Sequence, residues 1–500
     1  MSINPLSGSM PEPDGDPMIS TPAHGKTFSP IEVILGVAIL SLLTVGIWEF
    51  GGFTTNEQIF YRRGHHGGNY ALLTAVAVLF EGKMQALLAL AFGGGIVFYL
   101  TSAHPTNLPP ADAFIRRQLW LLFFGVVIAF LLLFPAEVFY PFAVVGIILF
   151  GFWRFSTRGL LITSFFFLLI FFGKQFWNYQ DDKKDYRKYI AVTAVEKRIK
   201  QDSTTRAKKD SLLRAGDTLA LKNDWGKHKI SDSTAKKNDT LTKKQAGEKG
   251  KWEGLVKATK YDSAKTASLN KAMRDGSYTK VWNRVMKQSQ DKESLWLYRI
   301  GLWEIGSMML LGMALVKWGF FSPVFPRGRH LLLAALGLIA GAGLAWYRLH
   351  VNNIRLGDYE GFVKSHNTPY DLFVPLENLL MALGYASLVM ALIGPRLLNG
   401  FWRAMGLVGK MGVTNYFLQC IACSFFFYGY GLGYFGKLEQ LELYFMVLEL
   451  TMLQIVFSIL WLRYFRLGPL EWLWSCLIYR KWLPLRDYET YAGSTAPASA

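Results

Sequence analysis

The hydrophobic residues of this chain fall into ten long apolar segments, which one long polar stretch divides into two groups of five. Most segments approach the roughly 20 residues with which a helix crosses the hydrocarbon core of a bilayer. A core helix of a soluble protein is apolar on one face, whereas these segments are apolar all round. The pattern predicts an all-α integral membrane protein, a polytopic bundle of about ten transmembrane helices, with spans near residues 30–50, 83–103, 117–134, 136–153, 159–178, 296–317, 329–347, 371–394, 411–433 and 442–464.

The polar segments complete the predicted organisation. Residues 1–28 and 487–500 are polar tails that we expect to be disordered. Residues 179–295 form one long extramembrane insertion between an N-terminal half, 29–178, and a C-terminal half, 296–486. Because this insertion is poor in apolar residues and rich in Ser, Thr, Lys and Asp, we expect it to be largely disordered or loosely helical.

The positive charge of the chain is concentrated in the insertion. The net charge is +18, and residues 181–290 hold 28 Lys and Arg against 14 Asp and Glu. A basic protein often binds nucleic acid, but a charge run confined to one loop is more simply a solvated polar insertion. The functional alternative is adhesion of this lysine-rich loop to anionic lipid headgroups or envelope polymers.

The short loops carry their positive charge on one side of the membrane. With ten spans, one side receives 16 Lys and Arg and the other side receives 6. The positive-inside rule then predicts that both termini are cytoplasmic and that the insertion lies outside, since long loops cross the membrane largely regardless of charge.

Ionisable side chains inside the spans are the first candidates for a functional site, because they are costly in hydrocarbon and usually face the interior of a bundle. Glu81 and Lys83 lie where the apolar stretch 69–80, an interfacial helix or an extension of the second span, meets that span. Residues two apart point to different faces of a regular helix. Glu81 and Lys83 therefore need separate partners or an irregular backbone at Gly82.

Two histidines lie just upstream of this pair. His65 or His66 could act as a general base, because the pKa of histidine lies near neutrality. Lys83 would then stabilise developing charge, and Glu81 would orient one of the catalytic groups. The alternative is a pair of interfacial histidines that face water.

Further polar residues in or beside the spans are candidates for substrate binding: Glu137, Glu304, Glu377, Asn415, Gln419, Tyr428 and Tyr430. Asn415 and Gln419 are four apart on one helical face, and amides in such positions commonly join helices. Glu304, Glu377 and Glu449 could instead couple protons to transport.

Other sites are disfavoured by the sequence. Cys420 and Cys423 form a CxxC pair within an apolar helix, where burial is more plausible than redox chemistry. The chain contains no HExxH motif and no GxSxG elbow. We therefore expect no metal site, and no cofactor is evident from the residues.

Four motifs occur in the region from the end of the insertion to the C-terminus. They are RDGSY at 274–278, GKMGVTNYFLQ at 409–419, FYGYGLGYFG at 427–436 and FRLGPLEWLW at 465–474. In order and spacing they closely resemble the YeiB-like family, a family of bacterial membrane proteins whose C-terminal part is called domain of unknown function 418.

The N-terminal half fits this family more loosely. LFEGKM at 79–84 and FGGG at 92–95 resemble the family's second-helix motif, and Glu137 falls where the family tends to be acidic. Leu35 replaces a usual arginine, and Ala129 a frequent histidine. The resemblance implies a multi-pass protein of the bacterial inner membrane, distantly similar to acyltransferases that use acyl-CoA.

Three functions remain open at this level. The first is an acyltransferase-like enzyme that moves an acyl group to an extracytoplasmic acceptor, with acyl-CoA as the only implied cofactor. The second is a proton- or ion-coupled transporter. The third is a non-enzymatic envelope factor, whose partners would be membrane lipids; the sequence predicts no oligomeric state.

Overall fold

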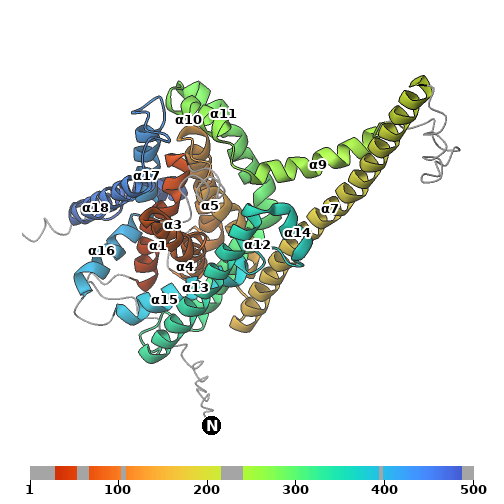
Figure 1. Cartoon of the computed structure of the whole chain (residues 1–500). Helices are drawn as coiled ribbons and strands as arrows, with labels where there is room; N and C mark the ends of the chain where they lie inside the picture. Colours follow the sequence, from red (N-terminus) through yellow and green to blue (C-terminus); the bar gives the residue numbers. More distant parts are fainter. Residues whose placement is uncertain (1–28, 53–66, 103–107, 216–239, 394–397, 487–500) are drawn as a thin grey trace, which may run out of the picture.

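The computed structural model describes residues 29–52, 67–102, 108–215, 240–393 and 398–486 (Figure 1). Within these ranges the chain forms helices and turns and no strand, which confirms the all-α prediction. Eight helices are long and apolar enough to cross a membrane, and two shorter apolar helices lie at Phe139–Phe152 and Gly412–Phe427. These ten segments fall at the positions of the ten predicted spans.

The described helices fall into an N-terminal half, a middle segment and a C-terminal half. The N-terminal half contains α1 (Pro30–Gly51), α3 (Gly68–Leu79), α4 (Lys83–Thr101), α5 (Pro110–Val126), η1 (Val127–Leu131), α6 (Phe139–Leu149), η2 (Phe150–Phe152) and α7 (Thr157–Ala215). The middle of the chain contains α9 (Lys243–Thr259), α10 (Ser263–Arg274), α11 (Tyr278–Asp291) and η3 (Lys292–Gly301). The C-terminal half contains α12 (Leu302–Lys317), α13 (Arg327–Gly357), α14 (Tyr359–Ser365), α15 (Val374–Leu392), α16 (Asn399–Lys410), α17 (Gly412–Phe427), α18 (Gln440–Tyr464) and α19 (Pro469–Tyr479).

Glycines allow the central helices to approach closely. A Cβ atom on Gly93 of α4 would collide with the Met309 carbonyl oxygen of α12, and one on Gly312 of α12 would collide with the Leu90 carbonyl oxygen of α4. Gly36 makes the same kind of contact between α1 and α16. Small residues at such crossings are typical of helix association in lipid, where dispersion contacts replace the hydrophobic effect.

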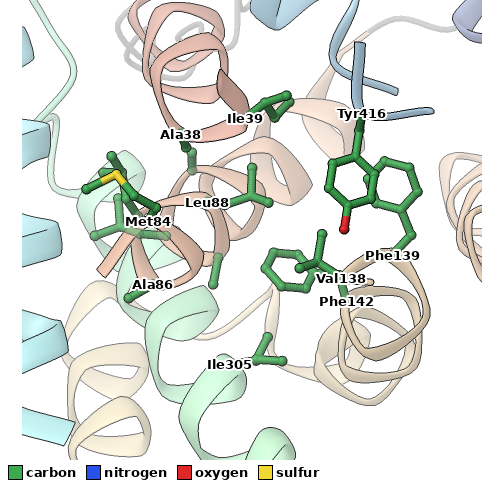
Figure 2. Packing of buried hydrophobic residues seen from close by; sticks show 14 of the residues in the cluster. Ala38, Ile39, Met84, Ala86, Leu88, Val138, Phe139, Phe142, Ile305 and Tyr416 are labelled. Atoms are coloured by element: carbon green, nitrogen blue, oxygen red, sulfur yellow. The ribbon is translucent and has the colours of Figure 1, made fainter. Parts of the chain in front are cut away.

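Large side chains fill the interior where the helices diverge. Figure 2 shows Tyr416 of α17 beside Phe139 of α6, with Ile39 of α1, Leu88 of α4 and Ile305 of α12 in the same cluster. The ring centroids of Tyr416 and Phe139 are 4.7 Å apart. The interior thus joins helices of both halves into one bundle.

Helix α7 extends far beyond this bundle. Its 59 residues span about 90 Å at 1.5 Å per residue, and its distal part projects away from the bundle and meets α9 (Figure 1). We call residues 178–215 of α7 together with α9 the arm, and the end of the bundle from which it projects the arm end. Lys317 marks the opposite end, where its ammonium group donates to the carbonyl oxygens of Trp153 and Phe155.

The described part of the polar insertion is more ordered than its composition predicts. Trp252 of α9 is 1% exposed, and its ring lies 5.0 Å from that of Tyr186 and 5.4 Å from that of Tyr359. Lys251 of α9 also forms an ion pair of 2.5 Å with Asp185 of α7. A few aromatic residues therefore pack the arm helices together despite the low apolar content.

Candidate functional site

A network of buried charges lies near the arm end of the bundle. Arg348 of α13 donates from Nε to Glu377 Oε2 at 2.9 Å and from Nη2 to Glu81 Oε2 at 3.1 Å. Glu377 of α15 also pairs with Lys83 of α4. Lys83 and Glu377 are 0% and 1% exposed, and the two cations balance the two carboxylates. Arg348 thus links α13, α15 and the α3–α4 junction. The sequence analysis counted Arg348 among the six positive residues of the outer loops, but it lies inside α13.

The backbone between α3 and α4 positions Glu81 and Lys83 for this network. The helix is interrupted at residues 80–82, and Gly82 has a φ of +76°, a conformation that glycine adopts without strain. The Lys83 ammonium group donates to the Ala77 carbonyl oxygen at 2.9 Å, at the end of α3. Both conditions expected from the spacing are met, since Glu81 and Lys83 have separate partners and the backbone turns at Gly82.

Glu304 lies beside this network. Asn378 of α15 donates from Nδ2 to Glu304 Oε1 at 2.8 Å. The Asn378 side chain also lies against Gly82, where an added Cβ atom would be 3.0 Å from Asn378 Oδ1. Glu304 therefore meets a neutral amide at the same junction.

A partly enclosed cavity of about 360 Å³ adjoins the network at the arm end. Its walls come from α1, the α3–α4 junction, the α5–α6 turn, η3 and α17. The polar side chains that line it are Glu49, Glu81, Gln85, Lys292, Tyr416 and Gln419. The Gln85 amide nitrogen is buried and has no hydrogen-bond partner within the described part of the chain. The cavity therefore offers both signs of charge and an unused donor to a bound molecule.

Two charged groups of the cavity, Glu49 and Lys292, hydrogen-bond to neutral partners. Glu49 Oε2 accepts a 3.4 Å hydrogen bond from the Gln288 amide. The Lys292 ammonium group donates to the Glu137 carbonyl oxygen at 3.1 Å and lies 5.5 Å from the centre of the Trp296 ring. The cavity thus contains a carboxylate and an ammonium group whose hydrogen bonds go to neutral groups.

Glu137 supports the cavity wall from the α5–α6 turn. Its carboxylate accepts backbone hydrogen bonds from Phe139 at 2.8 Å and Tyr140 at 3.1 Å, at the start of α6. Burial raises the pKa of Glu137 to about 7, although Lys292 and these two donors act in the opposite direction. The side chain thus closes a helix N-terminus, a position that favours a negative charge.

The amides of α17 mainly join helices. Asn415 donates to Ser458 Oγ of α18 at 2.9 Å, and Gln419 donates to Gln454 Oε1 of α18 at 2.9 Å. Gln454 in turn donates to the Asn415 carbonyl oxygen at 2.6 Å. These contacts are those of the helix-joining alternative, although Gln419 also lines the cavity.

The remaining predicted residues lie apart from the cavity lining. The Tyr428 hydroxyl donates to the Leu133 carbonyl oxygen at 2.8 Å, and the Tyr430 ring packs at 5.3 Å from that of Tyr278. Glu449 is exposed on α18. His65 and His66 lie outside the described residues.

The two cysteines of α17 lie in the core of the bundle. Cys420 and Cys423 are buried free thiols, as expected of a pair in the core. The described ranges contain no group of three or more His, Cys, Asp and Glu side chains that could hold a metal ion.

Three important residues were missed by the sequence reasoning. Glu49 and Lys292 lie in the cavity, and Arg348 organises the ion pairs. All three are ionisable residues that lie close to a predicted span end: Glu49 near residue 50, Lys292 near residue 296 and Arg348 near residue 347. The position of an ionisable residue at the end of an apolar span is the signal in the sequence that distinguishes these three residues.

The fold and the site define a polytopic membrane protein with a polar cavity at one end of its helix bundle and buried ion pairs beside it. Residues 315–481 match the family described as "Protein of unknown function (DUF418)". The chain is 33% identical over 199 residues to "Uncharacterized protein YeiB" of Escherichia coli (strain K12), which covers 36% of this chain and 45% of that protein. Residues 315–481 thus carry the domain that the C-terminal motifs predicted, and the chain is similar to YeiB over part of its length.

Other relatives agree with this assignment. The chain is 43% identical over 83 residues to "Uncharacterized protein YxaH" of Bacillus subtilis (strain 168), covering 17% of this chain and 21% of that protein. It is 27% identical over 101 residues to an "Uncharacterized 39.9 kDa protein in amylase 3'region" of Bacillus acidopullulyticus, covering 20% and 29%. The chain spans less than half the length of these relatives, and their names state no activity. No solved structure matches the chain.

Proposed function

We propose that this protein is a membrane enzyme that transfers an acyl group to a polar acceptor in the cavity at the arm end. The observation that carries the proposal is the presence of Glu49 and Lys292 in one cavity, each bonded to a neutral group rather than to a counterion. Acyl transfer needs a base for the acceptor and a positive group for the oxyanion. The distant similarity of the family to membrane acyltransferases points to the same class of reaction.

Each group has a defined task in this reaction. Glu49 accepts the proton of an acceptor hydroxyl as its oxygen attacks the carbonyl carbon of an acyl thioester such as acyl-CoA. Lys292 and the free Gln85 amide stabilise the negative carbonyl oxygen that develops. The carbon–sulfur bond then breaks, and the thiolate leaves with the proton from Glu49. Lys83, which directs its ammonium group to Glu377, has a structural task in this scheme.

The closed packing beside the cavity favours an enzyme over a carrier. The glycine contacts between α4 and α12 bring the two backbones together, and the Arg348 and Lys83 ion pairs fill the space next to the cavity. A carrier must open this region during each cycle, whereas an enzyme that receives its acceptor at the arm end keeps it closed. The inner-membrane location and cytoplasmic termini expected from the loop charges would put the arm end outside.

One observation favours a proton-coupled transporter as the second candidate. The Glu304 carboxylate is hydrogen-bonded to the neutral Asn378 amide, and a carboxylate in that setting can release and accept a proton during a transport cycle. This candidate requires pH-dependent uptake by proteoliposomes, and Glu304→Gln would abolish that dependence. A non-enzymatic envelope factor requires instead that substitutions at the site alter stability alone.

The test uses the full-length protein in lipid nanodiscs. Labelled acyl thioesters of several chain lengths are offered with panels of sugars, peptides and lipids, and the transfer of label is measured. Glu49→Gln and Lys292→Met are expected to lower the rate by about 100-fold or more, the usual size of an acid–base or oxyanion contribution.

The matched controls are Asp291→Asn and Lys287→Met, which change exposed residues of the neighbouring helix α11. These controls are expected to keep the wild-type rate. Transfer that survives in both cavity variants, or that fails equally in both controls, would contradict the proposal.

A further inference from the structure

A second cavity, of about 590 Å³, lies between α5 and α19. The Trp474 indole of α19 donates to the Arg117 carbonyl oxygen of α5 at 3.1 Å, which fixes the two helices together. Helix α5 begins at the end of the bundle opposite the arm and runs toward the arm end. The second cavity is therefore remote from the one that contains Glu49 and Lys292.

Three cationic side chains line this cavity. They are Arg116, near the start of α5, and Arg480 and Lys481, directly after α19. Arg116 also donates to the Ile478 carbonyl oxygen at 3.4 Å, and Arg480 ends α19 with a φ of +52°. The residues that line the cavity, all within the described part of the chain, include no carboxylate. The lining residues of the rim thus carry positive charge only.

The remaining walls are apolar and open to the surroundings of the bundle. Leu119 and Phe123 line the cavity from α5, and they are 53% and 50% exposed. Phe123 lies seven residues beyond Arg116, which is about 10 Å deeper along a membrane-spanning helix. Leu473 and Leu477 form the facing wall on α19. A groove with a cationic rim and a lipid-facing apolar wall matches the two parts of an amphiphile.

We propose that this groove binds an anionic phospholipid. Its phosphate lies among Arg116, Arg480 and Lys481, and one acyl chain follows Leu119 and Phe123 between α5 and α19. Basic pockets between membrane helices recognise anionic headgroups in this way. A free anion would gain nothing from the exposed apolar wall, and a helix of a second copy would leave three cations without counterions. The inference does not depend on acyl transfer at the other cavity.

Native mass spectrometry of the full-length protein tests this proposal. The protein is exchanged into detergent with equal amounts of phosphatidylglycerol and phosphatidylcholine, and retained lipid is counted. The wild type is expected to retain phosphatidylglycerol preferentially. The triple variant Arg116→Gln, Arg480→Gln, Lys481→Gln is expected to weaken that retention on the order of 100-fold, given the attraction that each basic residue exerts on anionic lipid.

Two further variants separate the groove from general charge and from misfolding. The control triple Arg327→Gln, Arg329→Gln, Arg403→Gln removes three exposed cations elsewhere on the protein and is expected to retain phosphatidylglycerol like the wild type. Leu477→Trp fills the groove and keeps its charges, and it is expected to lower retention as strongly as the groove triple.

Several outcomes would overturn the proposal. They are equal retention of the two lipids by the wild type, unchanged retention in the groove triple or in a folded Leu477→Trp protein, and equal loss in the control triple. Preferential binding of inorganic phosphate or of a long-chain acyl-CoA over phosphatidylglycerol, measured in the same experiment, would also exclude a phospholipid as the occupant.

Discussion

At the scale of single residues, the buried charges depend on Arg348. Its guanidinium group bonds Glu377 through Nε and Nη2 and Glu81 through Nη2, while Lys83 holds the other side of Glu377. A buried pair contributes little net stability, but removal of one partner leaves an uncompensated charge that is costly. A substitution that removes the Arg348 guanidinium group therefore leaves two carboxylates and one cation, Lys83, in the network and lowers the stability of the fold.

Replacement of Arg348 by Met is expected to destabilise the protein by about 3–5 kcal/mol, the usual cost of breaking a buried ion pair on one side. The free energy of unfolding in mixed micelles measures the effect. Arg299→Met, which removes an exposed arginine of η3, is the control and is expected to change stability by less than about 0.5 kcal/mol. Equal stability of the two variants would show that the network carries no such cost.

The raised pKa of Glu137 predicts that the stability of the protein depends on pH. Its pKa is 4.5 in the reference state and about 7 in the folded protein, so folding favours the protonated form. Stability is therefore highest below the reference pKa, falls as the pH rises between these two values, and stays low above the folded pKa. Gln at this position keeps an acceptor oxygen for the Phe139 and Tyr140 amides and carries no charge.

The Glu137→Gln protein is accordingly expected to lose less thermal stability than the wild type between about pH 5 and about pH 8. The thermal midpoint of the detergent-solubilised protein, recorded across that range, is the measurement. Asp291→Asn, at an exposed carboxylate, is expected to follow the wild-type curve. Parallel curves for Glu137→Gln and the wild type would refute the prediction.

The residues of the site were only partly predictable. The spacing of Glu81 and Lys83 around Gly82 indicated either separate partners or an irregular backbone, because those conditions are local. Their actual partners, Arg348 and Glu377, are more than 250 residues away in the sequence. Nothing in a periodic pattern specifies which ionisable residues of distant helices meet.

At the scale of elements, glycine decides how closely α4 and α12 approach. Gly93 faces the backbone of Met309, whereas nothing lies within 4 Å of the position that a Cβ atom on Gly95 would occupy. The sequence shows three consecutive glycines at 93–95, but it does not specify which of them contacts a neighbouring helix. The two positions therefore form a matched pair for an experiment.

Ala at position 93 is expected to destabilise the protein by about 1–3 kcal/mol, the usual cost of inserting a methyl group into a filled interior. Ala at position 95 is expected to be neutral or slightly stabilising, because alanine loses less backbone entropy than glycine on folding. The free energy of unfolding in mixed micelles, measured for the Gly93→Ala and Gly95→Ala proteins, distinguishes the two positions. The opposite order of stability would mean that the close contact lies elsewhere in the triplet.

Helix boundaries show what a hydrophobic pattern can predict. Helix α1 ends at Gly51 and α12 at Lys317, within one residue of the predicted ends at 50 and 317, where glycines and a lysine interrupt the apolar sequence. Helix α7 was predicted to end at 178 but continues to Ala215. Its distal part is polar and is covered by Trp252 and Tyr359 from other segments, so hydropathy alone gave no sign of it.

At the scale of the whole molecule, the two cavities lie at opposite ends of one bundle. The cavity at the arm end is lined by Glu49, Glu81 and Lys292, and the groove at the other end is apolar with a cationic rim. The first suits a polar acceptor and the second an anionic lipid. The central claim is that the cavity at the arm end is the functional site, open to molecules that approach from that side.

Thiol labelling on intact cells tests this claim most directly. The background protein has Cys420, Cys423 and Cys476 replaced, and single cysteines are introduced as Lys292→Cys in the cavity, Lys251→Cys on the arm and Ala38→Cys in the buried part of α1. A membrane-impermeant thiol reagent is expected to label positions 292 and 251 from the same side and to leave position 38 unlabelled. Labelling of position 251 without position 292, or of position 292 only from the opposite side, would contradict the account.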